Sequence, residues 1–426
     1  MTFTNRRSVL QGLGALGATM TFAGLASASD GRARYLTRTN GDAADNVSAA
    51  GFDVRWELAD GRVLLVDGPA DAAADLEAVQ GVSLALPDLA FELERPSLEA
   101  SADVGTSSID QVYDEFLWDK QVQQVRETHD HATGAGRTVA IIDTGVDDTH
   151  PDLTVDTDAS VSVIGGAISE HIGDVDFHGT HVAGTAAANG SVGMLGTAPD
   201  ATIVSIRVFG DEGGAAFGDI LIGMEYAAAI GSDAANMSIG TAPIPPAANA
   251  DQYRRIMEPV AQSVTRAGTL LVGSAGNSDA NLQQEGFFTL PNSLSGVLSV
   301  SATAPNDERA FYSNYGTNEI DVGAPGGGYE TEEKTLIEDP DEVEWPYPLN
   351  LVYSTVPGSY GWAAGTSMAA PQVTGLAALV RELEPESNAR RVEGAIARGA
   401  EGTDGRSDPD FGAGRTNALE TVDRLL

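Results

Sequence analysis

The sequence of 426 residues contains no cysteine. Disulfides, a thiolate nucleophile and cysteine-based zinc sites are therefore excluded, and any metal would have to bind through oxygen or histidine. Lysine is nearly absent as well, because Lys120 and Lys334 are the only two. After the N-terminal stretch, no apolar run approaches the about 20 residues that a membrane-spanning helix needs, so we expect no stable insertion into a membrane.

Positive charge is scarce and negative charge is abundant. Lys and Arg number 24 against 62 Asp and Glu, which gives a formal net charge of −38. Such a surface repels nucleic acid and anionic lipid, so neither is an expected partner. Self-repulsion would strain a compact fold at low ionic strength, whereas molar salt shortens the Debye length to about 3 Å. Because the carboxylates are spread along the chain and not massed in one tail, we interpret the charge as adaptation to high salt.

The first 28 residues have the features of an export signal. Two arginines, Arg6 and Arg7, precede an apolar stretch that ends in the small-x-small pattern Ala26-Ser27-Ala28. This arrangement is typical of a twin-arginine signal peptide and predicts a secreted protein. The same stretch holds a literal G-x-G-x-x-G at residues 12–17. No strand precedes it, so we do not interpret it as a dinucleotide site.

Residues 31–95 alternate strand-like and helix-like stretches in the order βαββαβ, which predicts a small split-βαβ unit. Its last strand is predicted from the stretch SLALPDLAFELE at 83–94. Small and polar residues follow at 96–108, and this composition indicates a linker or a cleavage site. We therefore divide the chain after the signal into 29–106 and 107–426.

From residue 107 onward, short apolar runs alternate with helical patterns. The runs are TVAIID, TIVSIRVF, AANMSIG, GTLLVGSAG and VLSVSA. Continuous apolar runs between helices predict an α/β fold with a doubly wound, mostly parallel sheet and helices on both faces. Catalytic groups of such sheets lie beyond the carboxyl ends of the strands, so the residues after each run are the candidates. An acidic stretch at 329–345 is predicted to be an exposed loop.

Several polar residues stand at such positions, and each admits a structural alternative. Asp143 ends the first run, where it would also serve as a turn cap. His178 and His181 are three residues apart at the start of a predicted helix, so a zinc pair is geometrically possible, although no third ligand is evident. Ser367 begins an apolar helix, where serine is also a common N-cap. Asn277 in the stretch GSAGN is in isolation a typical turn residue.

Together these residues supply the groups that an activated serine nucleophile requires. A serine hydroxyl is a weak nucleophile unless an imidazole removes its proton and a carboxylate orients that imidazole. Asp143, His178 and Ser367 supply the three types in the order Asp, His, Ser. The amide of Asn277 would add a donor for the negative oxygen of a tetrahedral intermediate. The alternative serine signature, G-x-S-x-G, does not occur in the sequence.

Four stretches closely resemble the motifs of the subtilisin family of serine proteases, and in particular its secreted haloarchaeal members, the halolysins. They are IIDTGVDDTHPDL, FHGTHVAGT, GSAGN and GTSMAAP, and the resemblance covers essentially all of 107–426. It implies that Asp143 is the acid, His178 the general base, Ser367 the nucleophile and Asn277 the oxyanion donor, while His181 packs instead of reacting. The implied protein is a secreted, halophilic, monomeric serine endopeptidase that acts on proteins and peptides.

The resemblance also implies where a substrate binds. Ser238, Ile239 and Gly240 match the strand that pairs with the bound peptide and lines the pocket for the residue before the scissile bond. A peptide held as an added strand is recognised mainly through its backbone, which implies broad specificity with an apolar or aromatic preference. Thr241 stands where many relatives have a second glycine.

A cofactor and an intramolecular partner follow from the same resemblance. Family members commonly hold Ca²⁺ through oxygen ligands, and the match implies Asp152 and Asp114 as ligands here. The loop at 187–196 departs from the pattern, because it is one residue shorter than the calcium-coordinating form. Residues 29–106 resemble the family's propeptide, which occupies the cleft until it is removed. We expect that removal to occur by cleavage between about residues 96 and 112.

Overall fold

The computed structural model describes residues 31–426 except 94–96, 103–107, 246–249, 284–286 and 404–407. The predicted signal peptide, residues 1–28, lies outside the described residues. Within the described part of the chain, no helix has the length and apolar character needed to cross a membrane.

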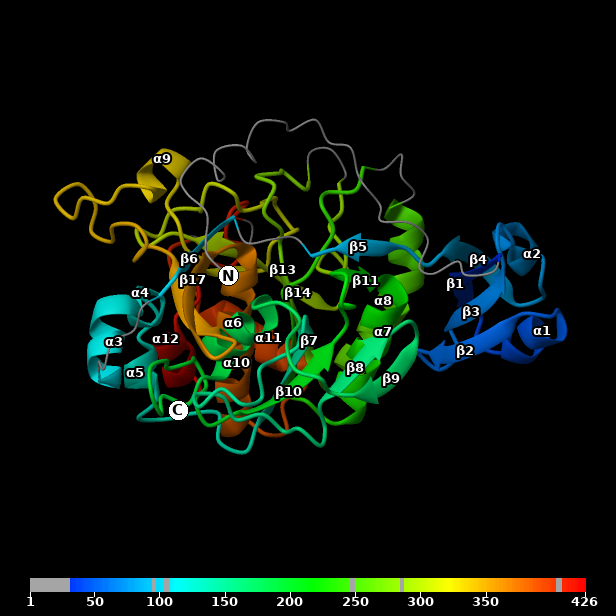
Figure 1. The fold of residues 1–426 in the computed structure, drawn as a ribbon, viewed down its shortest axis with the longest axis horizontal. Helices are drawn as coiled ribbons and strands as arrows, with labels where there is room; N and C mark the ends of the chain where they lie inside the picture. Colours follow the sequence, from blue (N-terminus) through cyan, green and yellow to red (C-terminus); the bar gives the residue numbers. More distant parts are fainter. Residues whose placement is uncertain (1–30, 94–96, 103–107, 246–249, 284–286, 404–407) are drawn as a thin grey trace.

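The small N-terminal unit is a four-stranded antiparallel sheet in the order β2-β3-β1-β4 (Figure 1). Alternate side chains separate its two faces. Tyr35, Leu64 and Val66 pack with the two helices of the unit, whereas Leu36 and Leu65 face the other way. The elements are β1 (Arg32–Thr39), α1 (Ala44–Ala49), β2 (Asp53–Leu58), β3 (Val63–Pro69), α2 (Ala73–Glu77) and β4 (Val82–Pro87).

The structure corrects the prediction of a single strand at 83–94. β4 ends at Pro87, and β5 (Ala90–Glu92) leaves the small sheet to pair antiparallel with β11 (Gly214–Ala216) of the large unit. The predicted linker also contains a strand, β6 (Leu98–Ser101), which pairs antiparallel with β17 (Ser359–Ala364). Edge strands pair through backbone N–H and C=O groups that every composition provides, so the residue pattern gave no sign of these contacts.

An eight-stranded sheet forms the centre of the large unit and confirms the predicted α/β fold class. Its order is β15-β14-β13-β12-β7-β10-β8-β9, and all neighbouring strands are parallel except β8 and β9. Every apolar run singled out in the sequence is one of these strands. The eight strands of the sheet are β7 (Thr138–Asp143), β8 (Val161–Ile164), β9 (Ala167–Glu170), β10 (Thr202–Arg207), β12 (Ala234–Met237), β13 (Leu270–Ser274), β14 (Val297–Thr303) and β15 (Val322–Pro325).

Helices cover both faces of this sheet, as strand β7 shows. Val139 and Ile141 pack in one hydrophobic cluster with α6 and α10, while Ala140 and Ile142 pack in another with α7 and α8. Burial on both faces explains why the run TVAIID is continuously apolar. The helices are α6 (His178–Ala187), α7 (Phe217–Ala229), α8 (Ala250–Ala267) and α10 (Thr366–Leu383).

The remaining elements lie around this core. They are α3 (Ile109–Phe116), α4 (Trp118–Gln121), α5 (Val125–Thr128), α9 (Glu332–Thr335), β16 (Val352–Val356), α11 (Ala389–Gly399) and α12 (Ala418–Asp423). The acidic stretch 329–345 differs from the exposed loop that we predicted. It contains α9, and its Tyr329 and Val343 are buried in a cluster with Ala304. Apolar residues anchor the stretch while its carboxylates face outward.

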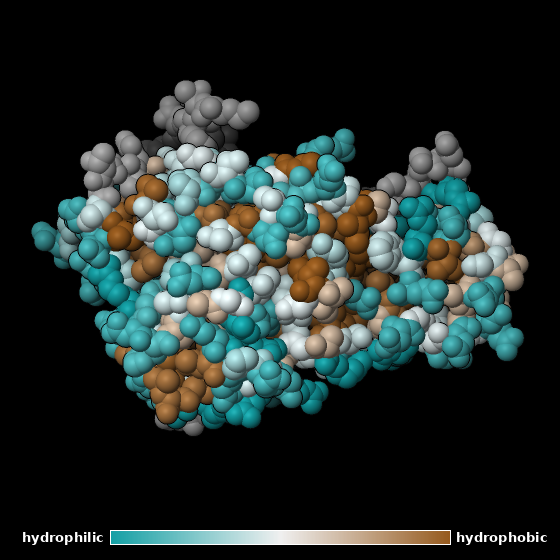
Figure 2. Space-filling view, turned by 90° about the horizontal axis from the view of Figure 1, so that it is seen from below, coloured by the Kyte–Doolittle hydropathy of each residue, from teal (hydrophilic) through white to brown (hydrophobic). Residues whose placement is uncertain are grey.

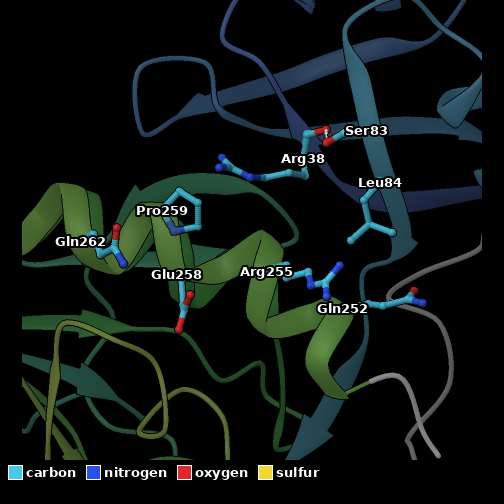
Figure 3. A pocket seen from close by; sticks show the side chains of 8 residues that line it. All are labelled: Arg38, Ser83, Leu84, Gln252, Arg255, Glu258, Pro259 and Gln262. Atoms are coloured by element: carbon cyan, nitrogen blue, oxygen red, sulfur yellow. Dashed lines mark hydrogen bonds between the residues drawn. The ribbon is translucent and has the colours of Figure 1, made fainter. Parts of the chain in front are cut away.

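The two units share a hydrophobic cluster. Leu36 and Leu65 from the small sheet lie in the cluster that contains residues of α7 and α8. A pocket opens beside this contact, with Arg38, Ser83 and Leu84 on one side and α8 on the other (Figure 3). None of the candidate site residues lines this pocket. The small unit therefore docks on the helical face formed by α7 and α8.

Candidate active site

Three candidate residues are gathered by three adjacent parallel strands. β13, β12 and β7 are neighbours in the sheet, and the chain beyond them carries Asn277, Ser238 and, at the last position of β7, Asp143. The pairing of Asn236 with Ile141 on one side and Val272 on the other fixes the relative register of these strands. The carboxyl edge of the sheet thus brings together residues that are far apart in the sequence.

Asp143 and His178 form a fully buried pair. The distance from His178 Nδ1 to Asp143 Oδ1 is 2.8 Å, and the backbone N–H of Thr144 donates to the same oxygen at 2.8 Å. Burial opposes protonation of His178, but the adjacent Asp143 charge and its hydrogen bond outweigh it, so the pKa of the imidazole is raised. The other ring nitrogen, Nε2, has no hydrogen-bond partner among the described residues. This arrangement leaves Nε2 available as a base.

Glycines allow the backbones around this pair to approach closely. Gly145 has φ of 108°, and a Cβ at this position would lie 2.0 Å from the carbonyl oxygen of Gly173. A Cβ at Gly179 would lie 2.0 Å from the carbonyl oxygen of Gly145. Any side chain at either position would push β7 and α6 apart. The glycines of the stretches DTG and HGT are thus required by the packing that holds Asp143 against His178.

Ser367 is the second residue of α10, and α10 packs against α6, the helix that begins at His178. Its Oγ donates to the carbonyl of Ser238 at 3.3 Å, and the hydroxyl of Ser238 donates to the carbonyl of Ser367 at 2.7 Å. The serine hydroxyl is therefore bonded to the loop after β12 and not to His178.

Hydrogen bonds to its oxygen orient the side-chain amide of Asn277. Its Oδ1 accepts from the backbone N–H of Thr366 at 2.8 Å and from the Thr366 hydroxyl at 2.9 Å. The Nδ2 end lies alongside Gly365, where a Cβ would be 3.4 Å away. With the oxygen held in this way, the N–H₂ group is presented beside the start of α10. The arrangement provides a side-chain donor next to the backbone N–H of Ser367.

His181 lies in a different environment from His178. It is fully buried, and its Nε2 is 3.2 Å from the carbonyl oxygen of Val352. Burial, together with the neighbouring His178, lowers the pKa of His181 to about 3, so the ring is neutral. Within the described residues, no group of three His, Cys, Asp or Glu side chains is arranged to hold a metal. The geometry therefore gives no support to a zinc pair at His178 and His181.

Asp174 is a site residue that the sequence reasoning missed. Its Oδ1 accepts from the Thr144 hydroxyl at 2.8 Å, and its Oδ2 accepts from the backbone N–H and the hydroxyl of Thr180 at 2.9 and 2.5 Å. Thr144 Oγ1 also accepts from the N–H of Gly179 at 2.9 Å. Asp174 thus links the residue after Asp143 to the residues after His178. Its only signal in the sequence was its position four residues before His178.

The predicted peptide-binding stretch turns its side chains inward. Ser238 and Ile239 are each 1% exposed, and Ile239 packs in the cluster of α7 and α8. Two hydrogen bonds join Thr241 and Leu290. Thr241 N–H donates to Leu290 O at 3.0 Å, and Leu290 N–H donates to Thr241 Oγ1 at 3.1 Å. A Cβ at Gly240 would lie 3.5 Å from the Leu290 carbonyl oxygen. Any contact of Ser238 or Ile239 with a peptide would therefore be made by the backbone.

Asp152, a predicted calcium ligand, is fully buried and already saturated with donors. Its Oδ1 accepts from Val192 N at 2.6 Å, and its Oδ2 accepts from Gly193 N at 2.8 Å and Met194 N at 2.9 Å. The hydroxyl of Tyr360 also donates to Oδ2, at 2.6 Å. Calcium requires six to eight oxygen ligands, whereas this carboxylate faces N–H and O–H groups. These N–H groups belong to residues 192–194, which lie in the loop at 187–196.

Asp114, the other predicted ligand, lies on α3 with a side chain that is 70% exposed. It forms an ion pair with Arg126, with 3.6 Å between Oδ1 and Nη1. Neither Asp114 nor Asp152 has the surroundings of a calcium ligand in this structure, and the pair implied by the resemblance stays a prediction.

Comparisons with known proteins agree with this geometry. The model of the subtilase family matches residues 134–414. The M-protease of Shouchella clausii is 36% identical over 288 residues, which cover 67% of this chain and 64% of that protein. Subtilisin Savinase of Lederbergia lenta is 36% identical over 288 residues, which cover 90% of its length. The solved epidermin leader peptide processing serine protease from Staphylococcus aureus shares the fold, with a TM-score of 0.75 and 19% identity over 92% of this chain and 98% of that chain.

Proposed function

Because this chain belongs to the subtilase family of serine proteases, we propose that it is an endopeptidase that hydrolyses peptide bonds through an acyl-enzyme on Ser367. The observation that carries the proposal is the buried hydrogen bond of 2.8 Å between His178 Nδ1 and Asp143 Oδ1, with Nε2 left without a partner among the described residues. A base that is oriented from one side and available on the other is what a serine nucleophile requires.

In this mechanism four residues carry the chemical steps. His178 Nε2 removes the proton of Ser367 Oγ as the oxygen attacks the peptide carbonyl, and Asp143 stabilises the imidazolium that forms. The Asn277 amide and the Ser367 backbone N–H donate to the developing oxyanion. His178 then protonates the leaving amine, and water releases the acyl group by the reverse sequence. Loss of the oxyanion asparagine in subtilisin lowers turnover roughly 10²–10³-fold, and we expect a similar loss for Asn277→Ala.

We propose a broad substrate range with an apolar or aromatic preference. The pocket beside Thr144 does not itself support this preference, because Glu92, Asp176, Asp211 and Glu212 line it together with Val175 and Phe209. Support for a broad range comes from β11, which already pairs with a strand of the same chain and would pair in the same way with an extended peptide. The substrates under this proposal are proteins and peptides, and neither nucleic acid nor a membrane is a partner.

We propose that residues 29–106 are a propeptide that covers the cleft. β5 pairs with β11 on one side of the site, and β6 pairs with β17 on the other. Between these strands the N–H of Ser97 donates to the carbonyl of Ala364 at 2.7 Å, three positions before Ser367. A segment held as a strand on both sides of the nucleophile blocks access for a substrate. Cleavage between about residues 96 and 112 would release the small unit.

Residues 1–28 complete the proposal as a twin-arginine signal peptide of a secreted, halophilic, monomeric enzyme. The net charge of −38 supports the halophilic assignment, as does the resemblance to halolysins. Structural calcium has no role at Asp152 in this proposal, because the carboxylate there is saturated with hydrogen-bond donors.

The decisive experiment is labelling with a fluorophosphonate in molar salt. We expect the processed protein to gain one adduct, located by peptide mass mapping at Ser367, and the Ser367→Ala variant to gain none. An unlabelled wild-type protein that still binds peptides would instead identify a non-catalytic peptide-binding protein. Peptide hydrolysis that survives the reagent but is abolished by zinc chelation would identify a metal-dependent hydrolase.

A further inference from the structure

Pro371 removes a hydrogen-bond donor from the helix that carries Ser367. In an α-helix the N–H of each residue donates to the carbonyl four residues earlier, so residue 371 would bond the carbonyl of Ser367. Proline has no N–H. Ser367 is 3% exposed, and a buried carbonyl that loses its donor destabilises the structure. The sequence GTSMAAP therefore creates an unfilled acceptor on the nucleophile itself.

Ser238 supplies the missing donor from outside the helix. Its Oγ lies 2.7 Å from the Ser367 carbonyl oxygen, and the Nδ2 group of Asn236 donates to the same Oγ at 2.9 Å. Because the Asn236 amide donates to the Ser238 oxygen, the proton of the Ser238 hydroxyl is directed to the Ser367 carbonyl. Asn236 is fixed in turn by the Thr374 hydroxyl, 3.1 Å from its Oδ1. This network lies in the interior, where each bond has a defined direction.

We propose that the hydroxyl of Ser238 is a positioning group for the nucleophile, an inference that rests on the proposed function. It replaces the helical bond that Pro371 removes and holds the Ser367 backbone in the orientation from which the Ser367 hydroxyl reaches His178. The return bond, from Ser367 Oγ to the Ser238 carbonyl at 3.3 Å, ties the same two residues in the opposite direction. Ser238 acts through Ser367 and does not itself react.

The test is a rescue experiment on the processed enzyme in molar salt. Ser238→Ala removes the donor, and we expect kcat to fall roughly 10- to 100-fold while KM changes less than about twofold, since only the geometry of the nucleophile is lost. Pro371→Ala restores an N–H four residues after Ser367. We expect Pro371→Ala alone to retain kcat within about threefold of wild type, and the double variant to regain most of what Ser238→Ala lost.

Ser301→Ala is the matched control. Ser301 is also fully buried and donates to a carbonyl, that of Asp410 at 2.6 Å, but it lies outside the site. We expect this variant to keep the wild-type kcat even where its melting temperature falls. A kcat loss of the same size in Ser301→Ala would show a general packing effect and overturn the inference.

Two outcomes separate this inference from the proposed function. If wild-type Ser367 is labelled by the fluorophosphonate and Ser238→Ala reacts equally fast, or if Pro371→Ala gives no rescue, the inference fails while the proposed function stands. If wild type is not labelled, the proposed function fails first. If Ser238→Ala does not fold, folding of the double variant supports the inference and its failure to fold overturns it.

Discussion

At the scale of single residues, Asp174 joins the segments that carry Asp143 and His178. Partial removal from water raises the pKa of Asp174 to about 6, although the hydroxyls of Thr180 and Thr144 and two backbone N–H groups stabilise its charge. A folded pKa above the unfolded value means that this group stabilises the fold below about pH 4 and loses that contribution as the pH rises through 6.

Asp174→Asn tests whether this carboxylate positions the segments that carry Asp143 and His178. We expect kcat/KM at pH 7 to fall roughly tenfold, because Thr144 and the start of α6 lose a shared acceptor. The melting temperature at the same pH should fall as well, because an N–H₂ group would face the donors that now bind the carboxylate. The acid limb of the pH profile should move to lower pH, because Asp174 is among the charges that raise the pKa of His178, with Asp143 and Asp176.

Asp147→Asn is the control for this experiment. Asp147 also follows β7 and accepts from Thr149 N at 3.0 Å and Gly358 N at 2.9 Å, but within the described part of the chain its carboxylate has no hydrogen bond to Thr144 or Thr180. An unchanged acid limb in Asp174→Asn, together with a lower melting temperature, would show that Asp174 is only structural.

Asp152 provides a second prediction at this scale. Asp152→Asn places an N–H₂ group against donors, and we expect a loss of about 3 kcal/mol in the free energy of unfolding, the range for hydrogen bonds to a buried charge. Denaturant unfolding of the Ser367→Ala protein, which avoids autolysis, measures this value. EDTA should not reproduce the loss. A chelator effect that occurs with Asp152 and disappears in Asp152→Asn would show that the carboxylate binds a cation after all.

At the scale of elements, the small unit is tied to the large unit by ions as well as by apolar packing. Arg34 on β1 binds Asp88 at 2.6 Å and Asp219 on α7 at 3.1 Å, and all three are nearly buried. Asp88 also accepts from the N–H of Gly218 at the start of α7, at 2.9 Å. Burial raises the pKa of Asp88 to about 6 in spite of the charge of Arg34. One arginine therefore balances two carboxylates that belong to different units.

Arg34→Met should loosen this junction, because two buried carboxylates would lose their cation. In the uncleaved Ser367→Ala chain we expect faster amide hydrogen exchange in β1 and β4, with exchange in β7 unchanged. Arg32→Met is the control, since Arg32 lies on the same strand but is exposed and, among the described residues, donates to the Asp67 carbonyl at 3.2 Å. Equal exchange in the two variants would show that the ion cluster does not hold the junction.

At the scale of the whole molecule, net charge sets the conditions for folding. Figure 2 shows hydrophilic residues distributed over both units on the face seen from below. With a net charge of −38, we expect the melting temperature and the activity to decline steadily as NaCl is reduced from molar concentration to about 0.1 M, where the Debye length is about 10 Å.

The pH distinguishes self-repulsion from other effects of salt. At low salt, acidification towards pH 4.5 neutralises part of the carboxylates and should restore part of the melting temperature, measured by circular dichroism. Full activity and an intact fold at low salt would contradict the halophilic assignment. A loss at low salt that acidification does not relieve would contradict self-repulsion as its cause.

Local patterns of residues were enough to predict the class of the fold and the types of residue at the site. Runs such as TVAIID identify buried parallel strands because their apolar character is a local property, and the strands β7, β10, β12, β13 and β14 lie where those runs predicted. Asp143, His178, Ser367 and Asn277 were selected because the motifs around them are short and contiguous. Residue roles at the site remain predictions for the experiments above.

Which groups meet in space became known from the folded chain alone. Ser238 and Ser367 are 129 positions apart, and no local pattern shows that one hydroxyl fills the acceptor that a proline leaves open. The motif around Asp152 gave no sign that the N–H groups of a distant loop donate to its oxygens. The strands β5 and β6 bond to β11 and β17 through the backbone. Hydrogen bonds between distant segments depend on distance and direction in space, which the order of residues along a chain does not specify.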